Sequence, residues 1–374
     1  MKDYFITGGT GVLGNEIAAR LLAQGDCHVR LLVRADTDAK AAHRVRDLVA
    51  YWQMDPAAVE GRLHVLRGDA TLPRFGFAES DYAMLSRTTT HVVHCAALVR
   101  MNLPLPEARQ SAVGAARNVL ALAEAARAAG ALEKVEFVST VGVGGRRDDA
   151  LEERWITEPR SFHNSYEQAK AEAEELVALA CERGLPLTVH RPSMVVGDST
   201  TGRIIRFQIF YHIVEFLSGR RTRGLFPSFG DARLDLIPVD VVAGTVCWSS
   251  RTGQTTGRIL HLCSGPRDAI SLVELRDRIR AKLRAIGATP AGPITVPMPL
   301  LRAVLPVVRM LVPERHKRAL DTLPVFLDYL AGRQAFANEA TVRLLGAAGI
   351  SIPPPRDYLA PVLDNYLANR REGT

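Results

Sequence analysis

A turn with regularly spaced glycines lies near the start of this 374-residue chain. The apolar run at residues 4–6 leads into Gly8, Gly11 and Gly14, and a helical pattern follows at residues 12–24. Glycine permits a tight turn, close approach of the backbone to a ligand, and close packing of a helix on a strand. A strand that enters a helix in this way exposes backbone N–H groups at the positive end of the helix dipole, which suits a pyrophosphate. The pattern therefore predicts a dinucleotide site formed by Thr7, Gly8, Thr10, Gly11, Val12, Leu13 and Gly14.

Short apolar segments alternate with helical patterns along the first half of the chain. We expect strands at residues 3–7, 28–33, 63–66, 91–95, 135–139 and 187–190, and helices at 12–24, 38–53, 107–129 and 161–183. Such alternation predicts an α/β fold of the Rossmann type, with a doubly wound parallel sheet covered by helices on both faces. A sheet of this kind binds its ligand beyond the carboxyl ends of the strands, near the switch in strand order.

The alternation becomes irregular after about residue 192. We expect further strands at 234–238 and 259–263, and further helices at 203–218, 239–249, 272–285 and 357–369. The expected organisation is a cofactor-binding core at residues 1–192, with return segments at about 234–264. Residues 193–233 and 265–374 are expected to form a smaller, mostly helical lobe that binds the substrate.

Composition and charge narrow the class of protein. Apolar residues make up 47% of the chain and charged residues 23%, which is ordinary for a soluble globular protein. The net charge of +7 is modest and no long basic run occurs, so we expect no nucleic-acid partner. The cysteines and histidines lack the spacing of metal ligands or of a disulfide framework, so neither is expected. The chain starts directly with a strand pattern, and its longest uncharged stretch, residues 285–301, contains four prolines and so cannot form a membrane-spanning helix. These features predict a cytoplasmic location.

Residues that end successive strands indicate which dinucleotide binds. Arg34 ends the second strand, where a guanidinium can hold a 2′-phosphate through two hydrogen bonds. Arg44 in the next helix could add a second positive charge. Small or acidic residues that can approach the adenine and the ribose end the third and fourth strands: Asp69, Ala70, Ala96 and Ala97. We therefore predict NADPH as the cofactor.

A tyrosine and a lysine four residues apart suggest carbonyl chemistry. Tyr166 and Lys170 fall in the predicted helix at 161–183, so both project from one face of it. A lysine ammonium beside a phenol favours the phenolate, and we expect it to lower the pKa of Tyr166 below its ordinary value of about 10. Such a tyrosine can give a proton to a carbonyl oxygen that receives hydride. The hydroxyl pair Ser139 and Thr140, at the end of the fifth strand, could hydrogen-bond the same oxygen.

The chain resembles the extended short-chain dehydrogenases/reductases over about residues 1–265. The resemblance rests on short motifs at residues 7–14, 68–69, 137–140, 166–170 and 191–192. It implies a Rossmann core and a Ser/Thr–Tyr–Lys triad, with Thr140 as the hydroxyl member and Ser139 as its neighbour. It also implies that Lys170 holds the nicotinamide ribose and that Asn118 supports a proton relay. Two further residues of the implied cofactor site are Pro192 and Val195.

A narrower resemblance indicates the substrate. The motifs at residues 32–35, 68–76 and 94–99 are similar to those of the fatty acyl-CoA reductases and thioester reductase domains, the male-sterility-like branch. That branch uses NADPH to reduce an acyl thioester to an aldehyde, and sometimes to an alcohol. Segments 191–193 and 235–240 would equally suit a ketone or aldehyde reductase, a hydroxysteroid-type dehydrogenase or a nucleotide-sugar epimerase. A non-catalytic dinucleotide-binding sensor is a remote alternative.

The substrate lobe carries two segments that bear on partners. Residues 299–312 are very apolar and could cover an acyl tunnel, contact a membrane surface peripherally, or pack as ordinary core. Arg220, Arg221 and Arg223 follow a helix end and could receive the phosphates of coenzyme A or the acidic face of an acyl carrier protein. Basic residues also favour helix C-termini for dipole reasons alone. The chain is expected to be a monomer or a homodimer.

Overall fold

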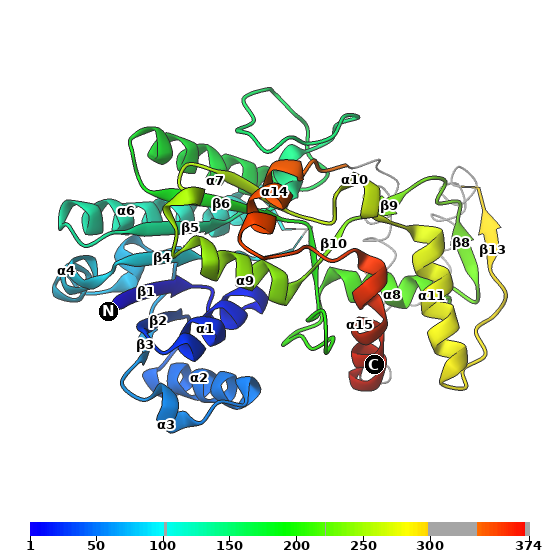
Figure 1. Ribbon diagram of the computed structural model, residues 1–374, viewed down its shortest axis with the longest axis horizontal. Helices are drawn as coiled ribbons and strands as arrows, with labels where there is room; N and C mark the ends of the chain where they lie inside the picture. Colours follow the sequence, from blue (N-terminus) through cyan, green and yellow to red (C-terminus); the bar gives the residue numbers. More distant parts are fainter. Residues whose placement is uncertain (101–102, 221, 298–334, 371–374) are drawn as a thin grey trace.

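The computed structural model describes residues 1–100, 103–220, 222–297 and 335–370 (Figure 1). A seven-stranded sheet forms its centre, in the order β11-β6-β5-β4-β1-β2-β3, and all neighbouring strands are parallel. The strands are β1 (Lys2–Thr7), β2 (Cys27–Val33), β3 (Leu63–Arg67), β4 (His91–His94), β5 (Lys134–Val138), β6 (Leu187–Pro192) and β11 (Ile259–Leu262). The strand order reverses between β1 and β4, so their carboxyl ends flank the crevice where such folds bind ligands. The prediction of a Rossmann-type doubly wound sheet is confirmed.

Helices cover both faces of this sheet (Figure 1). On one face pack α1 (Val12–Gln24), α2 (Asp38–Trp52) and α9 (Val239–Ser249), and on the other α4 (Glu79–Thr88), α6 (Ala115–Ala128) and α7 (Ser165–Glu182). Successive strand residues contribute to opposite cores: Phe5 to the cluster under α6 and α7, Tyr4 and Ile6 to the cluster under α1. The shorter helical segments are α3 (Pro56–Val59), η1 (Pro73–Gly76), α5 (Leu105–Arg109), η2 (Gln110–Gly114), η3 (Val141–Gly144) and η4 (Gly253–Thr255).

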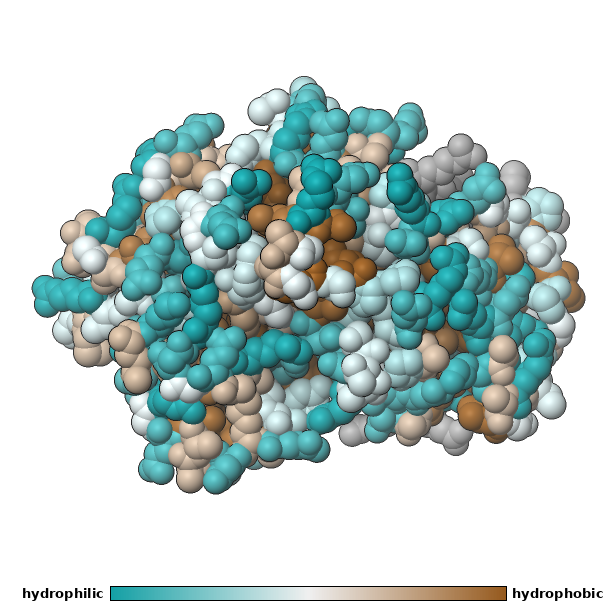
Figure 2. Space-filling view, viewed as in Figure 1, coloured by the Kyte–Doolittle hydropathy of each residue, from teal (hydrophilic) through white to brown (hydrophobic). Residues whose placement is uncertain are grey.

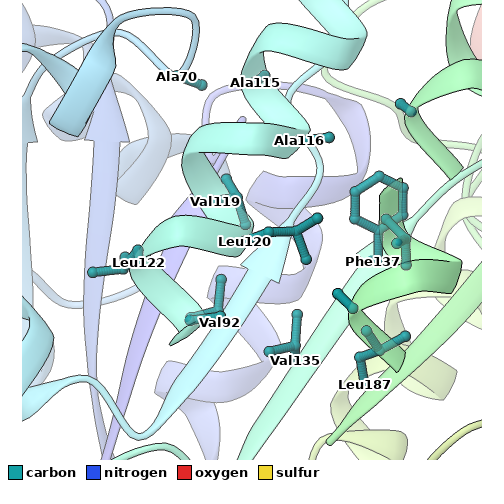
Figure 3. Close-up of a cluster of buried hydrophobic side chains, with 14 of the residues drawn as sticks. Ala70, Val92, Ala115, Ala116, Val119, Leu120, Leu122, Val135, Phe137 and Leu187 are labelled. Atoms are coloured by element: carbon teal, nitrogen blue, oxygen red, sulfur yellow. The ribbon is translucent and has the colours of Figure 1, made fainter. Parts of the chain in front are cut away.

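The core under α6 is built from small helical residues and branched strand residues (Figure 3). Ala116 and Val119 of α6 are fully buried, and so are Val92, Val135 and Leu187 of the strands below them. Alanines on the inner face of α6 allow the helix to approach the sheet closely. This contact fixes α6 over the centre of the sheet, beside α7.

A side-chain cap sets the start of α7. The Asn164 side chain accepts a hydrogen bond from the Glu167 N–H at 2.9 Å, which satisfies one of the free donors of the first turn. The helix therefore begins at Ser165, whereas the sequence pattern predicted a start at residue 161. Tyr166 consequently lies in the first turn of α7, close to the sheet edge.

Further boundaries in the chain differ from those predicted. The expected helix at 107–129 is a run of α5, the π-helix η2 and α6. The expected helix at 203–218 is shorter, because α8 (Ile209–Leu217) begins only after Gln208. Residues before it form a loop in which the Asp198 carboxylate accepts hydrogen bonds from the backbone of Thr200 and Thr201.

A second apolar core forms from segments after residue 193. It contains α8, α11 (Leu272–Ala285) and α15 (Pro355–Asn369), together with the short strands β7 (Met194–Val196), β9 (Arg233–Leu234) and β10 (Leu236–Pro238). The expected strand at 234–238 is thus divided at Asp235, whose carboxylate accepts hydrogen bonds from the Ser264 and Gly265 N–H groups. The remaining elements are β8 (Leu225–Pro227), α10 (Gly265–Asp268), β12 (Ile270–Ser271), β13 (Ile294–Val296) and α14 (Glu339–Ala347).

The surface of one face is mainly hydrophilic (Figure 2). Apolar side chains gather near its middle, around the position of α14 in Figure 1. Among the described residues, no helix is long and apolar enough to cross a membrane. The apolar segment at 299–312 lies outside the described residues.

We predict that Leu122→Ala destabilises the protein by about 2–5 kcal/mol, because Leu122 of α6 is fully buried in the core shown in Figure 3 and its removal leaves a cavity. The measurement is the free energy of unfolding in urea. Leu179→Ala on α7 is the control, since half of Leu179 is exposed, and we expect less than about 0.5 kcal/mol from it. Equal losses in the two variants would contradict the placement of α6 on the sheet.

Candidate active site

The turn after β1 is closely packed by its glycines. Gly8 has a φ of +73°, and a Cβ there would lie 2.6 Å from the Ala96 backbone nitrogen at the end of β4. A Cβ on Gly14 would overlap the Gly8 carbonyl oxygen. The Gly11 N–H donates to that same oxygen at 2.8 Å. Side chains at positions 8 and 14 would therefore force the turn away from β4 and α1.

The first turn of α1 is free to receive an anion. Gly11 is the N-cap residue, so no side chain caps the helix, and its first turn contains no acidic residue. The N–H groups and the positive helix end are thus directed to the crevice between β1 and β4. Of the predicted cofactor residues, the partly exposed ones are Gly8, Thr10, Gly11, Leu13, Asp69, Ala96, Ala97 and Val195.

Besides Lys170, five other predicted cofactor residues are buried. Thr7 is fully buried and its hydroxyl pairs with His94 Nδ1 at 2.8 Å, so its side chain ties β1 to β4. The structure thus argues against a side-chain contact between Thr7 and the cofactor. Val12, Gly14, Ala70 and Pro192 are buried as well.

Arg34 and Asp69 come together at the ends of β2 and β3. An Arg34 guanidinium nitrogen lies 3.9 Å from Asp69 Oδ2, and the Arg34 side chain is 67% exposed. Asp69 Oδ1 accepts hydrogen bonds from the Thr71 N–H and hydroxyl at 2.9 and 2.8 Å. Arg44 donates to the Arg34 carbonyl oxygen, so it supports the loop that carries Arg34. This edge can hold a phosphate through Arg34, because the loosely paired guanidinium keeps donors free.

Thr140 and Tyr166 lie near each other at the end of β5, close enough for the Thr140 hydroxyl to act on the Tyr166 phenol. The Thr140 hydroxyl oxygen accepts from the Gly142 N–H at 3.1 Å, so its own proton can be directed to a neighbouring oxygen. Burial nevertheless dominates and raises the pKa of Tyr166 to about 12, with Glu167 adding to the rise. The expectation that Lys170 lowers this pKa is therefore wrong for the free protein. A tyrosine with a raised pKa stays protonated at neutral pH, as a proton donor must.

Lys170 lies one turn further along α7 and is almost fully buried. Its ammonium donates to the Val138 carbonyl oxygen at 2.9 Å and lies 5.1 Å from the centre of the Phe137 ring. Burial lowers the pKa of Lys170 to about 8, while Glu174 and Cys95 act in the opposite direction. The ammonium is thus held at the end of β5, two residues from Thr140.

Two expected members of the proton machinery have other partners. The Ser139 hydroxyl donates to Glu174 Oε2 at 2.5 Å inside the protein, on the opposite side of the extended backbone from Thr140. This geometry argues against Ser139 as a catalytic residue. The Asn118 side chain donates to the Ala70 carbonyl oxygen at 2.9 Å, so it anchors the loop after β3.

The sequence interpretation missed Glu174. Its position four residues after Lys170 was the available signal, because residues at that spacing share a helix face. Its buried partners could not be read from the sequence, since they come from β5 and β6. Among the described residues, no group of histidines, cysteines and carboxylates could hold a metal ion.

The residues at this edge fit a dinucleotide. The glycine turn leaves room for a close ligand, the uncapped α1 suits a pyrophosphate, and Arg34 offers a phosphate contact. On the other side of the crevice, Thr140, Tyr166 and Lys170 offer a hydroxyl, a protonated phenol and an ammonium. The arrangement combines a binding edge for an anionic dinucleotide with a proton donor.

Comparisons with known proteins agree with this geometry. The family described as male sterility protein matches residues 6–246 of the chain. The chain is 33% identical over 202 residues to an isonitrile lipopeptide synthase of Streptomyces coeruleorubidus. This alignment covers 53% of this chain and 13% of that protein. It is 28% identical over 263 residues to a linear gramicidin synthase polypeptide of Brevibacillus parabrevis, covering 69% of this chain and 5% of that protein. The chain thus spans a small part of these curated relatives.

Solved structures are similar over nearly the whole chain. The terminal R domain from the myxalamid PKS-NRPS biosynthetic pathway has a TM-score of 0.80 and 27% identity, covering 98% of this chain and 91% of that one. A nonribosomal peptide synthetase reductase domain from Mycobacterium tuberculosis has a TM-score of 0.74 and 22% identity, covering 99% and 91%, and shows the same fold. The family match extends over more than half of the residues of this chain. The chain therefore belongs to the male sterility protein family within the extended short-chain dehydrogenases/reductases, and it is an NAD(P)H-dependent oxidoreductase.

Proposed function

We propose that this chain uses NADPH to reduce an acyl thioester to an aldehyde. The observation that carries the proposal is the meeting of Thr140, Tyr166 and Lys170 at the end of β5, across the crevice from the glycine turn. The likeness to a reductase domain of a nonribosomal peptide synthetase supports a thioester as the substrate. A thioester reduced once gives an aldehyde and a free thiol, and a second reduction would give an alcohol.

Each part of the crevice has a role in this reaction. The first turn of α1 would hold the pyrophosphate, Arg34 the 2′-phosphate and Lys170 the nicotinamide ribose. The bound cofactor would supply hydride to the carbonyl carbon. Tyr166 would give its proton to the carbonyl oxygen, and the Thr140 hydroxyl would orient the phenol and stabilise the phenolate that remains. The resulting hemithioacetal would then break its C–S bond and pass its hydroxyl proton to the departing sulfur, which gives one aldehyde and one free thiol.

The proposal includes the carrier that presents the thioester to the enzyme. We infer coenzyme A or an acyl carrier protein, because Arg220 and Arg223 are exposed and lack an ion pair among the described residues. Arg203 is not available for such a contact, because it donates to the Tyr51 carbonyl oxygen at 2.9 Å and stacks on the Tyr51 ring. The division at residue 192 into a cofactor core and a substrate lobe belongs to the same proposal.

The first test is the substrate. We expect NADPH oxidation with acyl-CoA or an acylated carrier protein, with an aldehyde and a free thiol as products identified by mass spectrometry. Ketones, steroids and nucleotide sugars serve as the comparison set. Turnover of one of these together with no turnover of any thioester would refute the proposal.

Tyr166→Phe removes the proton donor while keeping the ring. We predict a fall in kcat of at least about a hundredfold, because general acid catalysis contributes that much, and an unchanged Kd for NADPH by fluorescence titration. Tyr82→Phe on α4 is the matched control and should behave as wild type. A Tyr166→Phe enzyme with wild-type kcat would remove Tyr166 from the mechanism.

Arg34→Ala removes the proposed contact with the 2′-phosphate. A charge-assisted hydrogen bond contributes about 1.5–3 kcal/mol, so the preference for NADPH over NADH should fall about 10- to 100-fold. The measurement is kcat/KM with each cofactor. Arg46→Ala is the control, since Arg46 is an exposed residue of α2. The assignment of Arg34 fails if its variant and this control show the same cofactor preference.

A further inference from the structure

Glu174 of α7 and Arg191 of β6 form a buried ion pair behind the proposed active site. The side chains are 6% and 0% exposed. Arg191 Nε lies 3.1 and 3.2 Å from the two Glu174 oxygens, and Nη2 donates to the carboxylate as well. Ser139 adds its hydroxyl at 2.5 Å. The carboxylate is therefore held by a donor from β6 and a donor from the residue that follows β5.

Arg191 in turn is fixed by its surroundings. His261 Nδ1 lies 2.6 Å from the Ala337 carbonyl oxygen, so that nitrogen must donate, and Nε2 is left to accept from Arg191 Nη1 at 3.2 Å. Burial lowers the pKa of His261 to about 3, which keeps the imidazole neutral. The network thus links β5, α7, β6 and β11 through side chains that are shielded from water.

The network touches the triad at two points. Glu174 lies four residues after Lys170 and eight after Tyr166, so the three share one face of α7. Ser139 immediately precedes Thr140 in the segment that follows β5. A shift of Glu174 would therefore move the helix face and the strand end that together form the site.

Glu174 lies one turn after Lys170 on the same face of α7, where a carboxylate and an ammonium attract each other. Lys170 is surrounded by the Val138 carbonyl, the Phe137 ring, the Cys95 thiol and the His94 imidazole. Burial raises the pKa of Cys95 to about 12 and lowers that of His94 to about 3, so both are neutral. Among the described residues, Glu174 is the carboxylate that acts on Lys170. The cations that act on Glu174 are Arg160, Arg191 and Lys170 itself.

We propose that Glu174 is a positioning residue for the reaction: held by Arg191 and Ser139, it keeps Lys170 charged and fixes Thr140 and Tyr166 relative to each other. This inference rests on the proposed function, because that function gives Thr140, Tyr166 and Lys170 their roles in the reaction. The charge on Lys170, however, is a property of the free protein. It can be measured whether or not a thioester is the substrate.

The experiment is an NMR titration of the free protein carrying ¹³C-labelled lysine. Lysines are few in this chain, and the missing signal in Lys170→Arg assigns the Lys170 resonance. Glu174→Gln keeps the shape of the side chain and removes its charge. The loss of a unit charge one helix turn away in a partly screened interior is expected to lower the pKa of Lys170 by about one unit or more.

Glu172→Gln is the matched control for this titration. Glu172 lies on the same helix and pairs with Arg109, but at the surface and outside the network. We expect no change in the Lys170 titration there. A folded Glu174→Gln variant with a wild-type Lys170 titration overturns the proposal, and so does an equal shift in the Glu172→Gln control.

If Glu174→Gln fails to fold because Arg191 is left unpaired, the kcat of the Ser139→Ala variant tests the positioning role instead. That variant keeps the ion pair and removes only the link between Glu174 and the end of β5. We expect kcat to fall about tenfold or more on any carbonyl substrate that the wild type reduces, with an unchanged Kd for NADPH. An unchanged kcat overturns the positioning role, whereas a thioester that is not reduced at all counts against the proposed function alone.

Discussion

The close packing of the turn after β1 against the end of β4 is the contact on which the site depends. Gly8 lies so near the Ala96 backbone that a side chain would not fit, and Gly14 lies equally near the Gly8 carbonyl. This contact brings the start of α1 to the point where the strand order reverses. Because β5 lies next to β4, the same contact also places Thr140 and Lys170 across the crevice from the turn.

The burial of charged side chains near the site is a second constraint, and the ion pair of Glu174 with Arg191 is stabilised differently from Lys170. Arg191 and Glu174 are paired and hydrogen-bonded, which offsets the cost of removing two charges from water. Lys170 has no such direct partner among the described residues and relies on a carbonyl, an aromatic ring and the charge of Glu174 one turn away. A loosely compensated ammonium is ready to accept an additional ligand, which suits a residue that is proposed to hold a ribose.

The sequence predicted the core of the fold because its local patterns were strong. The helices at 12–24, 239–249 and 272–285 have the predicted bounds, and each is amphipathic or bounded by a turn residue. The glycine turn was found for the same reason. The α8 helix was predicted too long, because its apolar pattern continues into a loop organised by Asp198.

The pairings within the site could not be predicted, because they join distant parts of the chain. Ser139 was expected to face the carbonyl, yet it bonds Glu174, and Asn118 bonds a carbonyl 48 residues before it. The expected effect of Lys170 on Tyr166 also failed, since burial decides the pKa of both groups. Spacing along a helix shows which side chains share a face, but burial and partners depend on the assembled sheet.

Isotope transfer tests the central claim most directly. The protein would be incubated with an acyl thioester and NADPH that carries deuterium at the reactive position of the nicotinamide ring. The account predicts an aldehyde with one deuterium on its carbonyl carbon and one free thiol for each NADPH oxidised. Oxidation of NADPH without deuterium in the aldehyde, or deuterium transfer only to a ketone or sugar, would contradict it.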